Sequence, residues 1–245
     1  MATRLVHLVV DAADPQRLAR FWAAALGWEL AAEDDSEWDV WPAGYHYPDP
    51  AALPLVFVPV PEGKTGKNRV HLDLATTSPE HQAAEVARLR GLGATPADIG
   101  QGDVAWEVLA DPEGNEFCVL DPRAVYRDTG PVAAVVADCA DPAALAGFWE
   151  LAAGWAVADT ADGWVALRSP QRVGPYLELL RVPDAKLVKN RIHLDVAPFG
   201  GDHQVAEVRR LRAAGAQPID VGQGDARWTV LADPQGGEFC VLTPR

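Results

Sequence analysis

Residues 100–120, GQGDVAWEVLADPEGNEFCVL, return almost unchanged as residues 222–242, GQGDARWTVLADPQGGEFCVL. Residues 68–75, NRVHLDLA, return in the same way as residues 190–197, NRIHLDVA. Both pairs are separated by the same 122 positions. Because similarity at a constant spacing is typical of repeated structural units, we interpret the chain as an internal duplication.

The two copies differ in length by a short insertion. Near the start of each copy the separation is 127 positions, so the first copy carries five additional residues. We place them in the loop 44–52, GYHYPDPAA, because surface loops tolerate insertions and cores do not. The copies meet within 121–131, a polar stretch with several turn formers. We therefore predict two domains, residues 1–122 and 130–245.

Composition limits the classes of partner. The chain has 245 residues, of which 49% are hydrophobic and 23% charged, with a formal net charge of −14. An acidic surface repels phosphate backbones, so we expect no nucleic-acid partner. No apolar run approaches the roughly 18 residues of a membrane span, and the N-terminus lacks a signal-peptide pattern, so we expect no membrane partner. Three cysteines without CxxC spacing suit a reducing compartment, and we expect a cytoplasmic protein.

Each copy is predicted to contain two units of the same order. An amphipathic helix between Asp14-Pro15 and Gly27 follows the first strand, because Asp-Pro begins helices and glycine ends them. The predicted strands of the first copy are Leu5–Val10, Trp28–Glu33, Trp38–Trp41, Leu53–Val60, Arg69–Ala75, Thr95–Asp98, Trp106–Ala110 and Glu116–Leu120. A second helix follows Ser78-Pro79 and ends near Gly91 and Gly93. The order is βαβββ twice in each copy.

At this point the chain resembles the glyoxalase-like members of the vicinal oxygen chelate superfamily (the glyoxalase, bleomycin-resistance and dioxygenase group). Four features carry the resemblance: a first strand leading to a helix with Phe-Trp, a Leu-Gly-Trp helix end, a His-Leu-Asp strand, and the turn Asp-Pro-Glu-Gly-Asn before the final Glu-Phe. It covers nearly all of both copies. The resemblance implies an α+β fold of tandem domains, in which two βαβββ modules form an open curled sheet whose concave face holds a ligand.

The resemblance also implies four metal-ligand positions per site, on the first, fourth, fifth and eighth strands. They align with His7, Val56, His71 and Cys118 in the first copy and with Ala134, Glu178, His193 and Cys240 in the second. Alternation along each strand directs these side chains to one face, with His71 and Asp73 opposite Val70, Leu72 and Leu74.

Neither copy has the full set of ligands that the resemblance implies, so two interpretations stay open. His7, His71 and Cys118 would form a three-ligand site for zinc, iron or nickel, and Glu178, His193 and Cys240 would form a second one. Alternatively no metal binds, and each cysteine is a small buried hydrophobe. His71 and His193 would then belong to a structural network, with Asp73 and Arg69 in one copy and Asp195 and Arg191 in the other.

Tryptophans on strands provide a second candidate site. The chain has nine tryptophans, and five of them lie on or near predicted strands: Trp38 and, as the residues that we single out, the four tryptophans Trp41, Trp106, Trp164 and Trp228. Aromatic side chains bind flat or hydrophobic molecules at little cost in conformational entropy, so these four are our candidates for ligand binding, although core packing would also explain them.

Two functions follow from these patterns. The first is a small-molecule-binding protein, similar to superfamily members that sequester a hydrophobic or aromatic compound such as an antibiotic. The alternative is an enzyme, a metal-dependent lyase, isomerase or dioxygenase with its site in the first domain. We find no GxSxG, P-loop or dinucleotide-binding motif. The duplication predicts either a monomer with an internal pseudo-dimer or a homodimer.

Overall fold

Four βαβββ modules make up the computed structural model, which describes residues 3–32, 37–47 and 49–245. The strands of the first copy are β1 (Thr3–Ala12), β2 (Glu29–Ala32), β3 (Trp38–Trp41), β4 (Leu55–Pro59), β5 (Val70–Leu74), β6 (Thr95–Pro96), β7 (Glu107–Ala110) and β8 (Glu116–Val119). Those of the second are β9 (Val132–Cys139), β10 (Ala156–Ala161), β11 (Trp164–Arg168), β12 (Tyr176–Arg181), β13 (Ile192–Pro198), β14 (Gln217–Pro218), β15 (Thr229–Ala232) and β16 (Glu238–Val241). The predicted order is confirmed.

The two helices predicted for the first copy begin and end at their predicted caps. They are α1 (Pro15–Leu26), α2 (Pro79–Leu92), α3 (Pro142–Ala153) and α4 (Gln204–Ala213). Asp14 caps α1 by accepting a hydrogen bond from the backbone N–H of Arg17, and Gly27 ends it in the left-handed conformation at φ 65°. A side chain with a Cβ disfavours that conformation, which explains glycine there. A short 3₁₀ helix, η1 (Ala124–Tyr126), lies in the segment that connects the copies.

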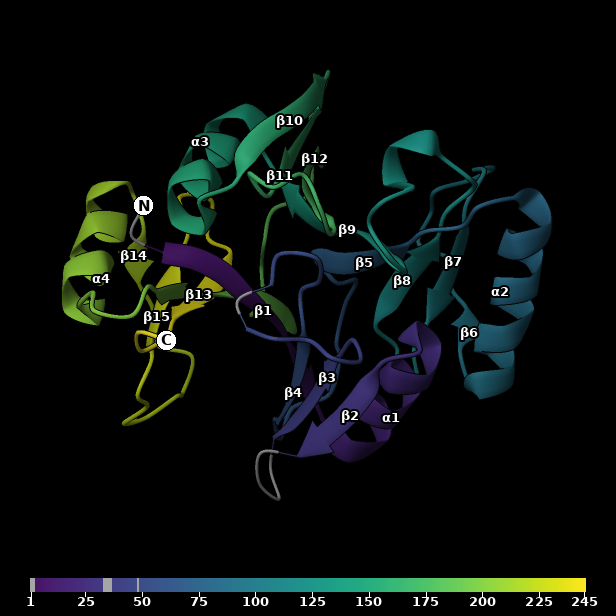
Figure 1. Ribbon diagram of the computed structural model, residues 1–245, viewed down its shortest axis with the longest axis horizontal. Coiled ribbons are helices and arrows are strands. Elements are labelled where there is room, and N and C mark those ends of the chain that lie inside the picture. Colours follow the sequence, from purple (N-terminus) through teal and green to yellow (C-terminus); the bar gives the residue numbers. More distant parts are fainter. Residues whose placement is uncertain (1–2, 33–36, 48) are drawn as a thin grey trace.

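The strands form two eight-stranded sheets, and each sheet combines one module from each copy. Sheet A has the order β14-β15-β16-β13-β1-β4-β3-β2, and sheet B has the order β10-β11-β12-β9-β5-β8-β7-β6. The junctions are antiparallel pairs, β1 with β13 and β5 with β9 (Figure 1). The predicted open, curled sheets of two βαβββ modules are confirmed, and the modules that share a sheet come from different copies. The two copies therefore complete each other within one chain, as an internal pseudo-dimer.

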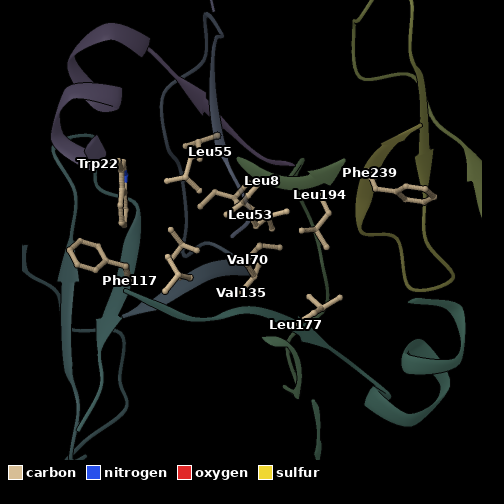
Figure 2. Packing of buried hydrophobic residues seen from close by; sticks show 14 of the residues in the cluster. Leu8, Trp22, Leu53, Leu55, Val70, Phe117, Val135, Leu177, Leu194 and Phe239 are labelled. Atoms are coloured by element: carbon tan, nitrogen blue, oxygen red, sulfur yellow. The ribbon is translucent and has the colours of Figure 1, made fainter. Parts of the chain in front are cut away.

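One hydrophobic core joins both sheets to the helices. Leu8 and Leu194 of sheet A meet Val70 and Val135 of sheet B in this cluster (Figure 2). Aromatic rings extend it under the helices, where Trp22 of α1 packs edge-on against Phe117 at 5.1 Å. Because strand side chains alternate, each sheet turns one face to this core and the other away from it. We call the second face the outer face, and it corresponds to the face expected to hold a ligand.

The loop that carries the insertion lies between β3 and β4 and packs against the second copy. A Cβ on Gly174 would lie 2.1 Å from the carbonyl oxygen of Pro50, and the φ of Gly174 is +72°. Residue 48 of this loop lies outside the described residues. The contact explains why position 174 is glycine, since both the backbone conformation and the space exclude a side chain.

No helix in the described part of the chain has the length and apolar character required to cross a membrane.

Candidate functional site

The outer face of sheet A brings together one set of potential metal ligands. His193 and Asp195 lie two residues apart on β13, and Cys240 lies beside Asp195 on β16. His193 Nε2 lies 3.4 Å from Cys240 Sγ and 3.6 Å from Asp195 Oδ1. All three side chains contribute ligand atoms that lie within 4.8 Å of one another. The separations match the roughly 3.3–3.8 Å between ligands that tetrahedral zinc bonds of 2.0–2.3 Å imply.

His7 reaches this set from β1, and an irregularity in the strand determines its position. The register between β1 and β13 shifts between Leu5 and His7, which indicates a β-bulge. Val6 packs into the outer-face cluster with Cys240, and His7 Nδ1 lies 3.9 Å from Asp195 Oδ2. His7 is therefore a neighbour of the His193, Asp195 and Cys240 set, on the side of Asp195.

The outer face of sheet B holds the equivalent set. His71 and Asp73 of β5 and Cys118 of β8 also contribute ligand atoms within 4.8 Å of one another, with 3.4 Å between His71 Nε2 and Asp73 Oδ1. Ala134 pairs with Asp73, in the place that His7 has beside Asp195. Val136 of β9 pairs with His71 of β5 on one side and with Glu178 of β12 on the other. Glu178 therefore adds a carboxylate to this face, two strands away from His71.

The segment between the copies covers part of the sheet B face. Tyr126 of η1 is buried and donates a hydrogen bond of 2.8 Å from its hydroxyl to Glu178 Oε1, and Trp164 Nε1 donates one of 2.9 Å to Oε2. Burial raises the pKa of Glu178 despite these two hydrogen bonds, and the charge of Asp73 adds to the effect. Both oxygens of Glu178 thus already accept hydrogen bonds from the protein itself. Tyr176 packs edge-on against Tyr126 beside them.

The structure therefore groups the predicted ligands by sheet and not by copy. The expected set of His7, His71 and Cys118 is wrong, because β1 lies in sheet A while β5 and β8 lie in sheet B. The expected set of Glu178, His193 and Cys240 is wrong for the same reason, because β12 lies in sheet B. A metal site confined to the first domain stays a prediction, since His71, Asp73 and Cys118 all belong to the first copy, whereas His193, Asp195 and Cys240 all belong to the second.

Two aspartates belong to these sets and were missed as ligands. The metal-free interpretation of the sequence places Asp73 and Asp195 in networks with Arg69 and Arg191, each four residues before its aspartate. In the structure, Arg69 donates to the carbonyl oxygens of Asp138 and Asp184. Arg191 donates in the same way to the carbonyl oxygens of Asp11 and Glu62. The signal was present in the sequence, because a residue two positions after a histidine on a strand lies on the same face.

The aspartates and the thiols of the two outer-face sets show whether these sets suit a cation. Within the described residues, Asp73 Oδ1 and Asp195 Oδ1 are buried and accept no hydrogen bond of good geometry. A buried carboxylate oxygen without a donor is costly, and a cation would satisfy it. Burial and the neighbouring aspartates raise the pKa of the Cys118 and Cys240 thiols, so without a cation both are neutral. A bound cation would instead lower the pKa of a thiol that it contacts, since metals bind the thiolate form.

Three of the four candidate tryptophans lie on the outer faces of the sheets. Trp106 and Trp164 pack against the same cluster on sheet B, where Trp106 also lies beneath the guanidinium of Arg123 at 5.6 Å. Trp41 belongs to the outer face of sheet A, because its neighbour Val40 lies in the core. Trp228 is 44% exposed. Whether these side chains bind a ligand stays a prediction.

Comparisons with known proteins agree with this architecture. A model of the glyoxalase-like domain matches residues 7–120 and again 134–242. Glyoxalase I from Zea mays has a similar solved structure, with a TM-score of 0.65 and 16% identity, covering 99% of this chain and 92% of that one. A putative dioxygenase from Bacillus subtilis gives a TM-score of 0.62 and 14% identity, covering 99% and 85%.

The two structural similarities concern the fold, because both identities are low. The comparison with curated proteins finds no match. The family model, in contrast, matches most of the sequence in two consecutive segments. The chain therefore belongs to the glyoxalase-like domain family of the vicinal oxygen chelate superfamily, with two tandem copies of the domain.

Proposed function

We propose that this protein binds a small molecule on the outer face of sheet A, at a divalent cation held by His193, Asp195 and Cys240. The observation that carries the proposal is that ligand atoms of these three residues lie within 4.8 Å of one another, while Asp195 Oδ1 is buried and accepts no hydrogen bond of good geometry. Thiolate, imidazole and carboxylate together favour zinc, with iron or nickel as alternatives.

The equivalent set on sheet B is the weaker candidate. Ala134 replaces the histidine there, and Glu178 is already bonded to Tyr126 and Trp164. On sheet A, His7 supplies an additional imidazole 3.9 Å from Asp195. We therefore assign the binding role to sheet A and a structural role to the polar network of sheet B.

The chain's own residues suggest how a ligand would be held. When bound, the cation would supply a Lewis-acid centre with a free coordination position for a ligand oxygen. His7 would orient Asp195 and would accept or return a proton at a ring nitrogen beside that position. Val6, Val230 and Leu242 pack around Cys240 and would exclude water from it. This arrangement supports a metal-dependent lyase, isomerase or dioxygenase as well as a metal-assisted binding protein.

A metal-free binding protein that sequesters a hydrophobic or aromatic compound is the second candidate. The raised pKa of the Cys240 thiol favours it, because a neutral buried thiol behaves as a small hydrophobe. Aromatic side chains around the outer faces, with Trp164 and Trp106 foremost, would then provide the contacts.

The test is a metal titration of protein that carries no histidine tag and has been stripped with a chelator. We expect one equivalent of Zn²⁺ to bind, and Co²⁺ to give a thiolate-to-metal absorption band that Cys240→Ser abolishes. The matched variant on the other sheet, Cys118→Ser, should keep the band. Loss of the band in Cys118→Ser alone would move the site to sheet B. Failure of the wild type to bind either cation would leave the metal-free candidate.

A further inference from the structure

The connecting segment, residues 121–131, carries one large buried side chain, that of Tyr126. Of its residues only Tyr126 and Thr129 are buried, and Val125, next to Tyr126, is 49% exposed. The Thr129 hydroxyl donates within the segment, to the carbonyl oxygen of Tyr126 at 2.9 Å. The ring of Tyr126 is therefore the main part of the segment that is buried against sheet B.

Small side chains of the outer face leave room for the Tyr126 ring. Those that share its cluster come from three strands: Cys118 of β8, Ala134 of β9 and Ala166 of β11. Tyr176 of β12 packs edge-on against the ring, with 5.8 Å between the centroids. Trp106 and Trp164, two of the tryptophans predicted to bind a ligand, pack against the same cluster. We call the place that the Tyr126 ring fills among these residues the ring site.

The hydroxyl of Tyr126 has a specific partner in the ring site. It donates a hydrogen bond of 2.8 Å to Glu178 Oε1, while Trp164 Nε1 donates to the other oxygen at 2.9 Å. Glu178 is buried, so an occupant without a donor would leave Oε1 unbonded, at a cost in free energy. The ring site therefore selects an aromatic ring that carries a hydroxyl donor.

The charge near this hydroxyl disfavours an anionic occupant. Burial raises the pKa of the Tyr126 hydroxyl, and the carboxyl groups of Glu178 and Asp73 add to the effect, while the cation of Arg123 has a smaller opposite effect. The same surroundings disfavour a carboxylate or a phosphate at this point. A neutral phenol is the group that matches both the ring and the hydrogen bond.

The rest of the connecting segment bonds mainly to itself. The backbone N–H groups in and directly after η1 donate to carbonyl oxygens of the segment. Besides the bond from Tyr126 to Glu178, the described residues show a long bond of 3.3 Å from Arg168 to the carbonyl oxygen of Asp128, and one from the Ala75 N–H to Pro131, where β9 begins. Moving η1 away from sheet B would therefore break few bonds.

We propose that the ring site binds a neutral phenol, and that the connecting segment closes this site with the side chain of Tyr126 as an internal competitor. A phenolic ligand displaces the Tyr126 ring, takes over its hydrogen bond to Glu178 and leaves the segment exposed. The inference does not depend on the cation proposed for sheet A, and it adds a ligand to the structural role of the sheet B network.

The first experiment is a calorimetric titration of Tyr126→Ala with p-cresol, which has the structure of the missing side chain. We expect saturable binding, and about tenfold weaker binding of toluene, which lacks the hydroxyl. The wild type should bind p-cresol about tenfold or more weakly than the variant, because the ligand must first displace Tyr126. Tyr126→Phe keeps the ring without its hydrogen bond, so its affinity should lie between the two, and it keeps the test open if Tyr126→Ala fails to fold.

Tryptic cleavage after Arg127 measures whether the ligand displaces the segment in the wild type. p-Cresol should accelerate this cleavage saturably, and toluene should do so less. Cleavage after Arg227, an exposed residue before β15 of sheet A, is the control and should stay constant.

The inference is overturned if Tyr126→Ala and Tyr126→Phe bind p-cresol no more tightly than the wild type. It is also overturned if cleavage of the wild type after Arg127 stays unchanged at about a hundredfold excess of p-cresol over the dissociation constant of the tighter-binding variant, because Tyr126 would then be a permanent part of the core. Cys240→Ser, which tests the cation site, should bind p-cresol as the wild type does. Loss of binding in that variant would contradict the inference by placing the ligand on sheet A.

Discussion

Glu178 illustrates how far one buried side chain depends on its surroundings. It occupies a position at which the superfamily resemblance implies a metal ligand, yet its two oxygens already accept hydrogen bonds from Tyr126 and Trp164. Burial raises its pKa because the ionised form is poorly solvated there. The same residue type on an exposed strand would remain an ordinary carboxylate. At the residue scale, the environment and not the identity of the side chain decides its role.

A raised pKa makes this carboxyl a source of pH-dependent stability. The folded state binds the proton more tightly than the unfolded state, whose carboxyl has a pKa of about 4.3. The contribution to the free energy of unfolding is therefore present below that pH and is lost as the pH rises through the folded pKa. Glu178→Gln cannot titrate, and it keeps an oxygen for Trp164 and an amide for Tyr126.

We therefore expect Glu178→Gln to gain stability relative to the wild type as the pH rises from acidic to neutral. Thermal unfolding of both proteins across that range measures the difference, with Glu107→Gln, an exposed glutamate, as the control. A constant difference between variant and wild type at every pH would show that Glu178 does not titrate as argued.

At the scale of elements, the Asp-Pro turns between the last two strands of each copy have different networks. Asp111 accepts hydrogen bonds from the backbone N–H groups of Glu113 and Asn115, from the Asn115 amide and from Trp22 Nε1. Asp233 accepts from the backbone of Gln235 and Gly237, and Trp149 also faces it. Glycine at position 237 removes the side-chain amide that Asn115 provides.

We expect Asp111→Ala to destabilise the protein by about 3 kcal/mol, because it leaves several buried donors without a partner. Asp233→Ala should cost about 1 kcal/mol less, since it leaves fewer. Urea unfolding of both variants measures the two losses. Equal losses would mean that the Asn115 amide contributes nothing to the network.

The contact between the inserted loop and Gly174 can be separated from backbone strain. Gly163 and Gly174 share a φ of +72°, but only at Gly174 would a Cβ meet backbone, the carbonyl oxygen of Pro50. Alanine should cost about 1–2 kcal/mol at either position through the left-handed conformation. Gly174→Ala should cost about 1–3 kcal/mol more, because the loop must move. Chemical denaturation of the two variants measures the loss in the free energy of unfolding. The same loss at both positions would mean that the loop moves away from the added Cβ without a measurable cost.

At the scale of the whole molecule, the exchange of modules makes the two copies interdependent. The β1–β13 and β5–β9 pairs are long, antiparallel and buried, and the core under them contains residues of both copies. Neither copy completes a sheet by itself.

We therefore expect the chain to survive cleavage between the copies. A protease site introduced after Arg127, which is exposed, should give two fragments that stay together as a 1:1 complex with a native circular dichroism spectrum. Size-exclusion chromatography with light scattering measures the mass of the complex. Dissociation into separate folded fragments would contradict the role assigned to the two strand pairs.

Several features of the molecule were predictable from the sequence because they depend on local patterns. The duplication is visible as a repeat, the helices as capped amphipathic segments, and the shared face of His71 and Cys118 as strand alternation. Asp73 and Asp195 could have been included by the same alternation. Tyr126 could not, because its segment has no periodic pattern and reaches Glu178 only through the fold.

The choice of partner module was decided by the tertiary structure alone. The strands VHLDL at 70–74 and IHLDV at 192–196 are nearly identical, so no local pattern indicates which of them pairs with β1. Pairing between distant strands depends on the combined packing of both sheets against one core, which a sequence pattern does not encode. For that reason the sequence by itself determined which residue types face the sites, whereas the tertiary structure decided that His7 joins His193, Asp195 and Cys240, and that Glu178 joins His71, Asp73 and Cys118.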